Sequence, residues 1–271
     1  MVIKKTRGAT KKLGPISLGH KTTRFQTRGN DKRTFSVHED LICAHSLFFK
    51  KKLQKVRKIL EGECSICHEE LDPCKGDIAF CKGSCGQNIH EKCIQQWTRT
   101  QRAGSTTCPM CRKPWVMGAE DLITLDSELD PDAVQIYLDW LYTGQLHISE
   151  AITRESDEFN IQLLKAWIVS EAFGDRNFRK DIIVQHYAAI DEDDNWGFRL
   201  DAIEFAFEDD DHDYMQSFVV DSVHAHADWD AIDDDIDNYP HEFVRKLCLA
   251  GIQFKQNQGT TAKDDMRENW E

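Results

Sequence analysis

Apolar residues alternate with polar ones at the start of the chain and then recur every three or four positions. Residues 25–35 alternate on both sides of a Gly-Asn-Asp turn at 29–31, which predicts a β-hairpin. Residues 33–38 continue as a short strand, and 39–50 have the spacing of an amphipathic helix. The first sixty residues therefore predict a small sheet followed by a helix.

The same two periods return after residue 120. Residues 121–125 predict a second short strand, and 130–144 predict a helix with Asp130 as N-cap, Pro131 in the first turn and Gly144 as its stop. Residues 163–174 predict a further helix. From about residue 195 the apolar stripes keep a helical period between acidic loops at 208–213 and 233–237. These loops lack the glycine and terminal glutamate of a calcium-binding EF-hand, so we interpret them as solvated acidic surface.

Composition indicates a globular protein without a membrane span. Of 271 residues, 40% are hydrophobic and 30% are charged, and no apolar run approaches the roughly 20 residues that cross a bilayer. The basic first residues are not followed by the apolar segment of a signal peptide. We therefore expect an intracellular protein, cytoplasmic or nuclear or both.

The net charge of −13 is unevenly distributed. Residues 1–60 sum to +13, residues 61–118 to zero and residues 119–271 to −26. The basic start, with lysines and arginines at 4, 5, 7, 11 and 12, has the composition of a nuclear-localisation patch, of a weak nucleic-acid contact or of a disordered, solvated tail. Nucleic acid is not an expected partner of this acidic chain.

Cysteines are concentrated in one segment. Eight of the ten lie from Cys64 to Cys111, and in a reducing compartment such a cluster indicates metal binding rather than disulfides. Cys43 and Cys248, outside the segment, are expected to be buried as small hydrophobes. The candidate ligands form four close pairs: Cys64 and Cys67, Cys81 and Cys85, His90 and Cys93, and Cys108 and Cys111.

Thiolates and one imidazole suit tetrahedral zinc, so eight ligands predict two zinc ions. From the spacing alone, consecutive pairs or alternate pairs could share an ion. His68 and Cys74 lie nearby and are expected not to be ligands, because eight others already fill two sites.

The ligand spacing resembles the RING family, in which alternate pairs combine. This resemblance implies one site formed by Cys64, Cys67, His90 and Cys93, and a second formed by Cys81, Cys85, Cys108 and Cys111. The chain departs from the commonest RING pattern at Gln87, where a histidine ligand would stand, so the order of four cysteines, one histidine and three cysteines also looks like a PHD finger. A PHD-like chromatin reader is therefore an alternative.

Residues between the ligands favour the RING. Family members that recruit a ubiquitin-conjugating enzyme resemble this chain at Ile66, Trp97, Pro109 and Arg112. The resemblance implies a shallow apolar groove for the conjugating enzyme, with Arg112 clamping ubiquitin. Each residue also has a structural reading, as a core cap, a turn former or a solvated charge. The expected function is a RING-type E3 ubiquitin ligase, or a ligase subunit, that transfers ubiquitin without a covalent intermediate and has no catalytic residue of its own.

The flanks together resemble a BTB/POZ domain of the kind abundant in fungal proteins. The first half of the resemblance lies at residues 35–49, and the second at the Leu-Tyr-Thr-Gly helix end, 141–144, and at the helix 163–174. This implies an α+β fold in which a cross-braced two-zinc RING interrupts a BTB-like domain. A BTB-mediated homodimer and a cullin are implied partners. The runner-up function is a non-catalytic adaptor with a structural zinc module.

Six segments follow from this interpretation. They are a basic disordered tail (1–14), the first BTB-like part (15–60), the RING insertion (61–118), the second BTB-like part (119–180), an acidic helical region (181–257) and a polar tail (258–271).

Overall fold

The computed structural model describes residues 18, 21–101, 106–116, 122–125, 129–149, 152, 156–193, 197–209, 211–227, 229–234 and 236–256. The tails predicted at 1–14 and 258–271, and the predicted end of the RING insertion at Gly118, lie outside these residues. The chain divides into two compact units, which are described separately. Unit 1 consists of residues 1–23, 36–44 and 49–121, and unit 2 of residues 24–35, 45–48 and 122–271.

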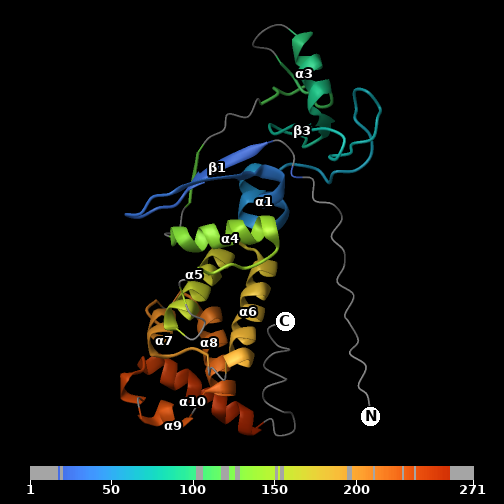
Figure 1. The fold of residues 1–271 in the computed structure, drawn as a ribbon. Coiled ribbons are helices and arrows are strands. Elements are labelled where there is room, and N and C mark those ends of the chain that lie inside the picture. Colours follow the sequence, from blue (N-terminus) through green and yellow to red (C-terminus); the bar gives the residue numbers. More distant parts are fainter. Residues whose placement is uncertain are drawn as a thin grey trace. The chain divides into compact units, whose positions relative to one another are not determined.

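Three short strands form one sheet in the order β2-β1-β5 (Figure 1). Their bounds are Thr22–Gln26 for β1, Thr34–His38 for β2 and Ile123–Thr124 for β5. β1 and β5 are parallel, with Phe25 opposite Ile123. β2 lies within the predicted strand 33–38, whereas β1 begins three residues before residue 25, the predicted start of the hairpin. Gly29 adopts a φ of 95° in the turn between them. This left-handed conformation favours glycine.

The prediction of a single helix after β2 is wrong, because the structure has two helices there. They are α1, Glu39–His45, and α2, Leu47–Leu53. Between them the buried Ser46 hydroxyl donates a 2.7 Å hydrogen bond to the carbonyl oxygen of Phe173. The residue between the two helices is thus bonded to a segment far along the chain.

The zinc segment of unit 1 contains a small β-hairpin and one helix. β3, Ile78–Phe80, pairs antiparallel with β4, Asn88–His90, and α3, Glu91–Arg99, follows directly. The buried residues of its core are Cys64, Leu71, Cys81, Ile89, Ile94, Cys108 and Trp115. Three of these seven are candidate ligands, so apolar burial by itself provides little stability.

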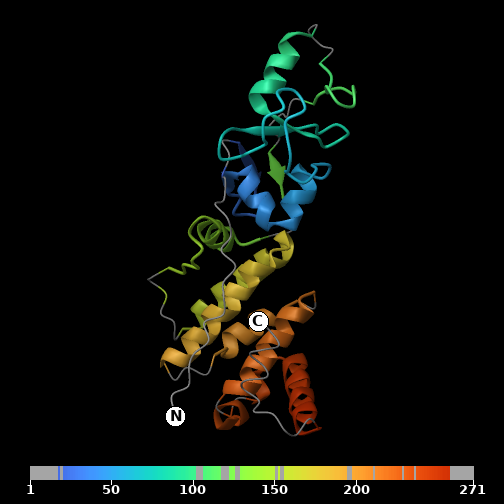
Figure 2. The same ribbon diagram turned by 90° about the vertical axis from the view of Figure 1, so that its right-hand side faces the viewer.

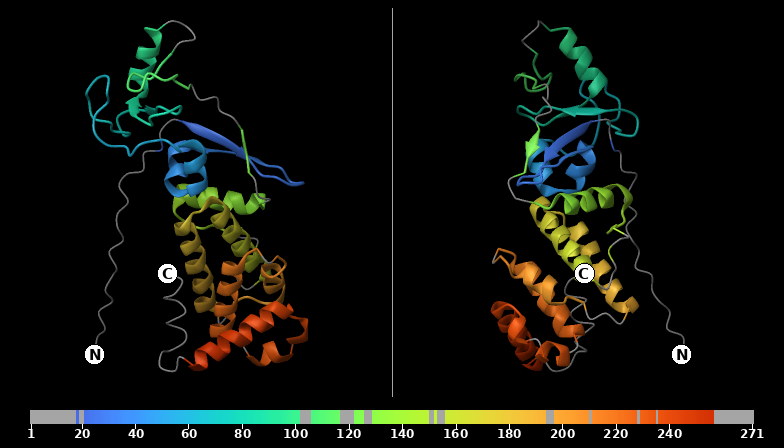
Figure 3. Two further views of the ribbon diagram at one scale, coloured as in Figure 1. Left: turned by 180° about the vertical axis from the view of Figure 1, so that it is seen from behind. Right: turned by 60° about the vertical axis from the view of Figure 1, so that its left-hand side comes forward.

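Unit 2 is mainly helical. Its longer helices are α4 (Pro131–Thr143), α5 (Asp157–Phe173), α6 (Arg176–Asp193), α8 (Asp213–His226) and α10 (His241–Gln256). Shorter segments are α7 (Leu200–Ala206), α9 (Trp229–Asp234) and a 3-10 turn (Ile236–Asn238). α5 packs against α4, α6 and α7, and α8 packs against α7 and α10 (Figures 2 and 3).

Aromatic side chains hold the sheet-proximal part of unit 2 together. The Phe173 ring meets Phe25 edge-on at 6.0 Å between centroids and Tyr137 at 5.0 Å. Tyr137 and Trp140 of α4 each meet Phe178 of α6 at 5.0 Å. Edge-to-face pairs at these distances are favourable beyond the area that they bury. This cluster connects β1 with the three helices that follow the zinc segment.

The predicted helices are present, but some of their boundaries differ from the prediction. α5 begins six residues before the predicted 163, with Ser156 as N-cap, and α6 runs without a break across the boundary predicted between residues 180 and 181. Cys43 is buried as expected, but the same expectation for Cys248 is wrong, because it lies on the exposed side of α10. In the part of the chain that the structure describes, no helix is both long and apolar enough to cross a membrane.

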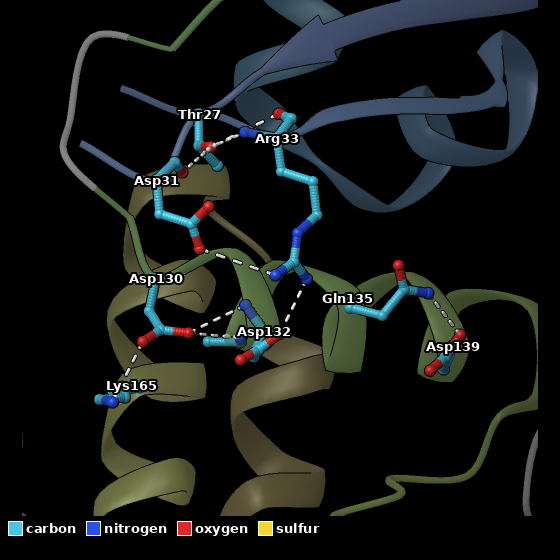
Figure 4. Close-up of polar contacts among 9 residues, drawn as sticks. Thr27, Asp31, Arg33, Asp130, Asp132, Gln135, Asp139 and Lys165 are labelled. Carbon is cyan, nitrogen blue, oxygen red and sulfur yellow. Dashed lines mark hydrogen bonds and ion pairs between the residues drawn. The ribbon is translucent and has the colours of Figure 1, made fainter. Parts of the chain in front are cut away.

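The start of α4 shows how its sequence signals work. One carboxylate oxygen of Asp130 accepts hydrogen bonds from the N–H groups of Asp132 and Ala133, at 2.9 and 3.0 Å. Its other oxygen lies 3.1 Å from Nζ of Lys165 (Figure 4). Gly144 ends the helix in the left-handed conformation. Burial opposes ionisation of Asp130, but these N–H groups and Lys165 outweigh it and lower the carboxyl pKa.

We therefore expect Asp130→Ala to lower the free energy of unfolding by about 1 kcal/mol, the usual cost of losing an N-cap. Asp139→Ala on the same helix, which removes only the exposed bond from Gln135 (Figure 4), should cost a few tenths of that amount. Because the folded pKa of Asp130 is depressed, the cap's contribution is complete above the unfolded pKa of about 3.9 and is lost as the pH falls through the folded value. Urea titrations of both variants at pH 7 and below pH 4 measure this. Equal destabilisation by the two variants at pH 7 contradicts it.

Candidate metal centre and partner-binding surface

The first ligand cluster is gathered from three places in unit 1. Cys64 and Cys67 lie in a loop before β3, His90 ends β4, and Cys93 lies in the first turn of α3. The ligand atoms of the four residues all lie within 4.8 Å of one another. Nδ1 of His90 is 3.3 Å from Sγ of Cys67 and 4.0 Å from Sγ of Cys93.

The second cluster combines the loop after β3 with a loop after α3. Cys81 and Cys85 come from the first, and Cys108 and Cys111 from the second. Two pairs of sulfurs across the cluster, Cys81 with Cys111 and Cys85 with Cys108, are each 3.8 Å apart. A tetrahedral zinc with bonds of about 2.3 Å to sulfur places its ligand sulfurs about 3.8 Å apart. The donor set and spacing therefore fit zinc.

Of the two arrangements that the spacing allows, the structure has the interleaved one. The first pair of ligands lies with the third, and the second with the fourth. His68 and Cys74 belong to neither cluster in the described chain. Closing one cluster alone would leave the other loop unattached, so the two ions would brace the hairpin, helix and both loops together.

The two outer loops, 62–71 and 106–115, repeat one backbone pattern with an offset of 44 residues. In each, the first cysteine N–H donates to the carbonyl oxygen five residues on, at 2.8 Å for Cys64 and 2.9 Å for Cys108. The carbonyl oxygen of each of these cysteines also accepts from the N–H four residues on, which belongs to His68 in one loop and Arg112 in the other, at 2.9 Å in both.

His68 and Arg112 are consequently held in the left-handed conformation, with φ of 62° and 61°. Non-glycine residues avoid this region at a cost of about 1–2 kcal/mol. Each loop then ends in a buried apolar residue, Leu71 or Trp115. The repeat could have been found by aligning the sequence with itself at this offset, which brings Cys64 onto Cys108.

His90 is oriented by a backbone contact behind it. Its Nε2 lies 3.1 Å from the carbonyl oxygen of Glu70, to which it donates when Nδ1 faces the metal. A bond of this kind fixes the tautomer and ring angle of a histidine ligand. Sequence reasoning missed the role of Glu70, because a main-chain acceptor has no residue signature.

The thiols of a cluster do not ionise together without a cation. Burial opposes ionisation of Cys64, but neighbouring backbone N–H groups outweigh it and lower the thiol pKa to about 6. Burial and the other thiols raise the pKa of Cys93 to about 12. In the second cluster the N–H of Lys113 lowers the pKa of Cys111 to about 6, and burial raises that of Cys108 to about 12. A divalent metal ion supplies the charge that three thiols in the first cluster, and four in the second, need to bind as thiolates.

The four expected contact residues lie in the two repeated loops and on α3. Ile66 and Trp97 are partly buried against the core of the zinc segment, and the indole N–H of Trp97 donates to the carbonyl oxygen of Thr107 at 2.9 Å. Pro109 is partly buried and Arg112 is exposed, both in the second loop. Met110 was missed. It occupies in the second loop the position of Ile66 in the first, and its side chain is 54% exposed.

Comparison with known proteins agrees with this geometry. Residues 62–112 match the family described as "Ring finger domain". These residues form a RING finger. The match favours the RING over the PHD-like alternative. It covers less than half of the chain, so it describes this segment and not the flanks.

The similar curated proteins each match only a short part of this chain. A "Probable E3 ubiquitin-protein ligase XERICO" of Arabidopsis thaliana is 34% identical over 71 residues, which are 26% of this chain and 40% of that protein. The "E3 ubiquitin-protein ligase ZSWIM2" of Homo sapiens is 41% identical over 56 residues, 20% of this chain and 9% of that protein. The chain thus spans well under half the length of these relatives. No solved structure matches it.

Two zinc ions per chain are expected from elemental analysis of the purified protein. His90→Ala should lower the content below two, because it removes a ligand that joins β4 to the first loop. His68→Gly is the matched control. Its backbone conformation suits glycine and its side chain is outside both clusters, so it should keep two ions. A content of two in His90→Ala, or of one or none in the unaltered protein, contradicts the ligand assignment.

Proposed function

We propose that the chain is a RING-type E3 ubiquitin ligase, or a ligase subunit, that binds a ubiquitin-conjugating enzyme through its RING finger. The observation that carries this is the pair of interleaved ligand clusters in a segment that matches the RING family. The names of the similar proteins support it. Zinc would stabilise the two loops, and no step of ubiquitin transfer passes through it.

Ile66, Trp97, Pro109 and Arg112 are the proposed contact residues. Ile66 and Pro109 lie in the two repeated loops, each partly buried, and Trp97 fixes the second loop to α3 through its bond to Thr107. An apolar groove of this kind would bind the loaded conjugating enzyme and hold its thioester in a reactive geometry, which accelerates transfer by positioning alone.

Arg112 is proposed to contact ubiquitin as a cation. Its side chain is exposed, and a guanidinium is charged at any physiological pH and can donate to two acceptors at once. Because the backbone of Arg112 is left-handed, substitutions there can separate the effect on backbone strain from the effect on charge. Glycine at this position relieves the backbone strain but removes the charge, whereas lysine keeps a charge in the strained backbone.

The flanks are proposed to form a BTB-like scaffold for a homodimer or a cullin. The order of elements supports this: a β-hairpin and two short helices precede the RING, and β5 then returns parallel to β1. α4 follows with its Gly144 stop. The RING would then be an insertion between α2 and β5.

The proposed activity is tested by discharge of ubiquitin-loaded conjugating enzymes onto free lysine. Ile66→Ala and Arg112→Gly should each slow discharge about tenfold, equivalent to roughly 1.4 kcal/mol of transition-state stabilisation. Arg112→Lys should retain part of the rate. Lys113→Ala, an exposed neighbour, should match the unaltered protein. If the unaltered protein fails with a whole panel of conjugating enzymes, the non-catalytic adaptor is favoured. Equal rates in all variants contradict the contact residues.

The scaffold proposal predicts a dimer. Light scattering of the full chain should give about twice the monomer mass of 31.3 kDa, because a scaffold of this kind associates through its own surface. A monomer mass at high protein concentration contradicts the homodimer.

A further inference from the structure

The segment that leads from α2 into the RING is bonded along its length, although a connection between two modules is commonly a loose tether. We call residues 54–60 the connecting segment. All of its bonds described below lie within unit 1. On one side it contacts α1, and on the other the β3–β4 hairpin of the RING.

Arg57 makes the central contacts of the connecting segment. Its Nη1 lies 2.6 Å from Oδ1 of Asp40 in α1, and its Nε donates to Oδ1 of Asn88 in β4 at 3.0 Å. Its carbon Cζ also lies 5.2 Å from the ring centroid of Phe80 in β3. The side chain is only 11% exposed. One guanidinium thus bridges a helix outside the RING and both strands inside it, largely shielded from water and salt.

The RING side of the connecting segment is equally closed. Asn88 is 2% exposed, and its Nδ2 donates to the carbonyl oxygens of Lys58 and Ile59 at 3.1 and 3.2 Å. The N–H of Lys58 donates to the carbonyl oxygen of Gly86 at 3.0 Å. Gly86 has a φ of 67°, and a Cβ there would collide with the carbonyl of Val56. The close approach therefore requires glycine at this position.

The α1 side has a second bond to the same acceptor. Nε2 of Gln54 donates to Oδ1 of Asp40 at 2.9 Å, so the connecting segment is fixed at both of its ends. Leu60, its last residue, packs against the core of the RING finger. Gln54 and Arg57 bond the connecting segment to α1, and the buried amide of Asn88 bonds it to the hairpin. These bonds leave α1 and the hairpin little freedom to move independently.

We propose that the connecting segment makes the RING finger and α1 one rigid body, with Arg57 as the positioning residue, so that ubiquitin is delivered to a restricted set of lysines. This rests on the proposed ligase function. In the transfer, a lysine Nζ attacks the thioester carbonyl of the ubiquitin-loaded enzyme. The new isopeptide bond replaces the broken thioester, and the conjugating-enzyme thiol leaves with the proton lost by the amine.

Acceptor lysines are present in the same unit. Lys50, Lys51, Lys52 and Lys55 are exposed on α2 and on the start of the connecting segment. If the RING is fixed relative to α1, only lysines that lie within reach of the bound enzyme are modified. If it swings freely, many lysines come within reach in turn. The breadth of self-modification therefore reports on the attachment.

Rigidity is measured first, without any ligase assay. Nitrogen-15 relaxation of the zinc-loaded full chain should give the same rotational correlation time for amides of α1 and of α3. Arg57→Ala should shorten the value for α3 and leave two zinc ions per chain. Different values for the two helices in the unaltered protein overturn the proposal.

Delivery is measured second, by mass spectrometry of ubiquitin on the chain's own lysines. In Arg57→Ala we expect the share of the most modified lysine to fall at least twofold, while discharge onto free lysine stays within twofold. Arg57→Lys keeps the ion pair with Asp40 and loses the Nε bond, so it should be intermediate. Arg24→Ala, which removes an exposed arginine from β1, should match the unaltered protein.

Asp40→Asn provides a second way to weaken the same bridge should Arg57→Ala fold poorly. It keeps the shape of the side chain and removes the charge, and it should broaden the distribution in the same way. An unchanged distribution in a folded, active Arg57→Ala or Asp40→Asn overturns the positioning role. An unaltered protein inactive in discharge overturns the ligase function and delivery with it, whereas relaxation still decides whether Arg57 fixes the RING to α1.

Discussion

Two clusters of four ligands, each built from two separate parts of the chain, are the constraint on which the RING segment depends. Its apolar core is small, and several of its buried members are themselves ligands, so hydrophobic burial alone does not hold the loops, the hairpin and α3 together. Because the ligand pairs interleave, the first cluster joins the start of the segment to its middle, and the second joins the middle to its end. The positions of Ile66 and Pro109, and hence the proposed groove, follow from the closure of both clusters.

The contacts of Arg57 connect the RING segment to α1, which lies outside the metal clusters. β4 supplies both a ligand, His90, and the buried amide of Asn88 that receives the connecting segment. The strand therefore links the metal centre to α1 through Asn88 and the side chain of Arg57. In the proposal made above, this link keeps the RING finger and α1 together, which is the physical basis for the proposed control over acceptor lysines.

Sequence-based prediction was most accurate at residue types with one dominant structural role, such as metal ligands and helix-end residues. Cysteine and histidine spacing predicted eight ligands in four pairs, and the resemblance to the RING family predicted how the pairs combine. The Asp-Pro start and glycine stop predicted α4 almost to the residue. Prediction failed where main-chain geometry decides. The break at Ser46, the carbonyl of Glu70 behind His90 and the approach of Val56 to Gly86 depend on atoms that every residue has. The bridge from Arg57 joins positions 17 and 31 residues away, which no local pattern reveals. The burial expected of Cys248 failed because α10 exposes that side of its apolar stripe.

The parallel pairing of β1 with β5 joins residues 98 positions apart, with the whole zinc segment between them. Closing so long a loop costs entropy that grows with the number of free residues, and such pairings form slowly. Once both ions are bound, the zinc segment is compact and the effective loop is much shorter. The order of events during synthesis then matters: a chain that acquires zinc early has a shorter search for its last strand. Metal supply would thereby influence the folding rate of a sheet whose three strands contribute none of the eight candidate ligands.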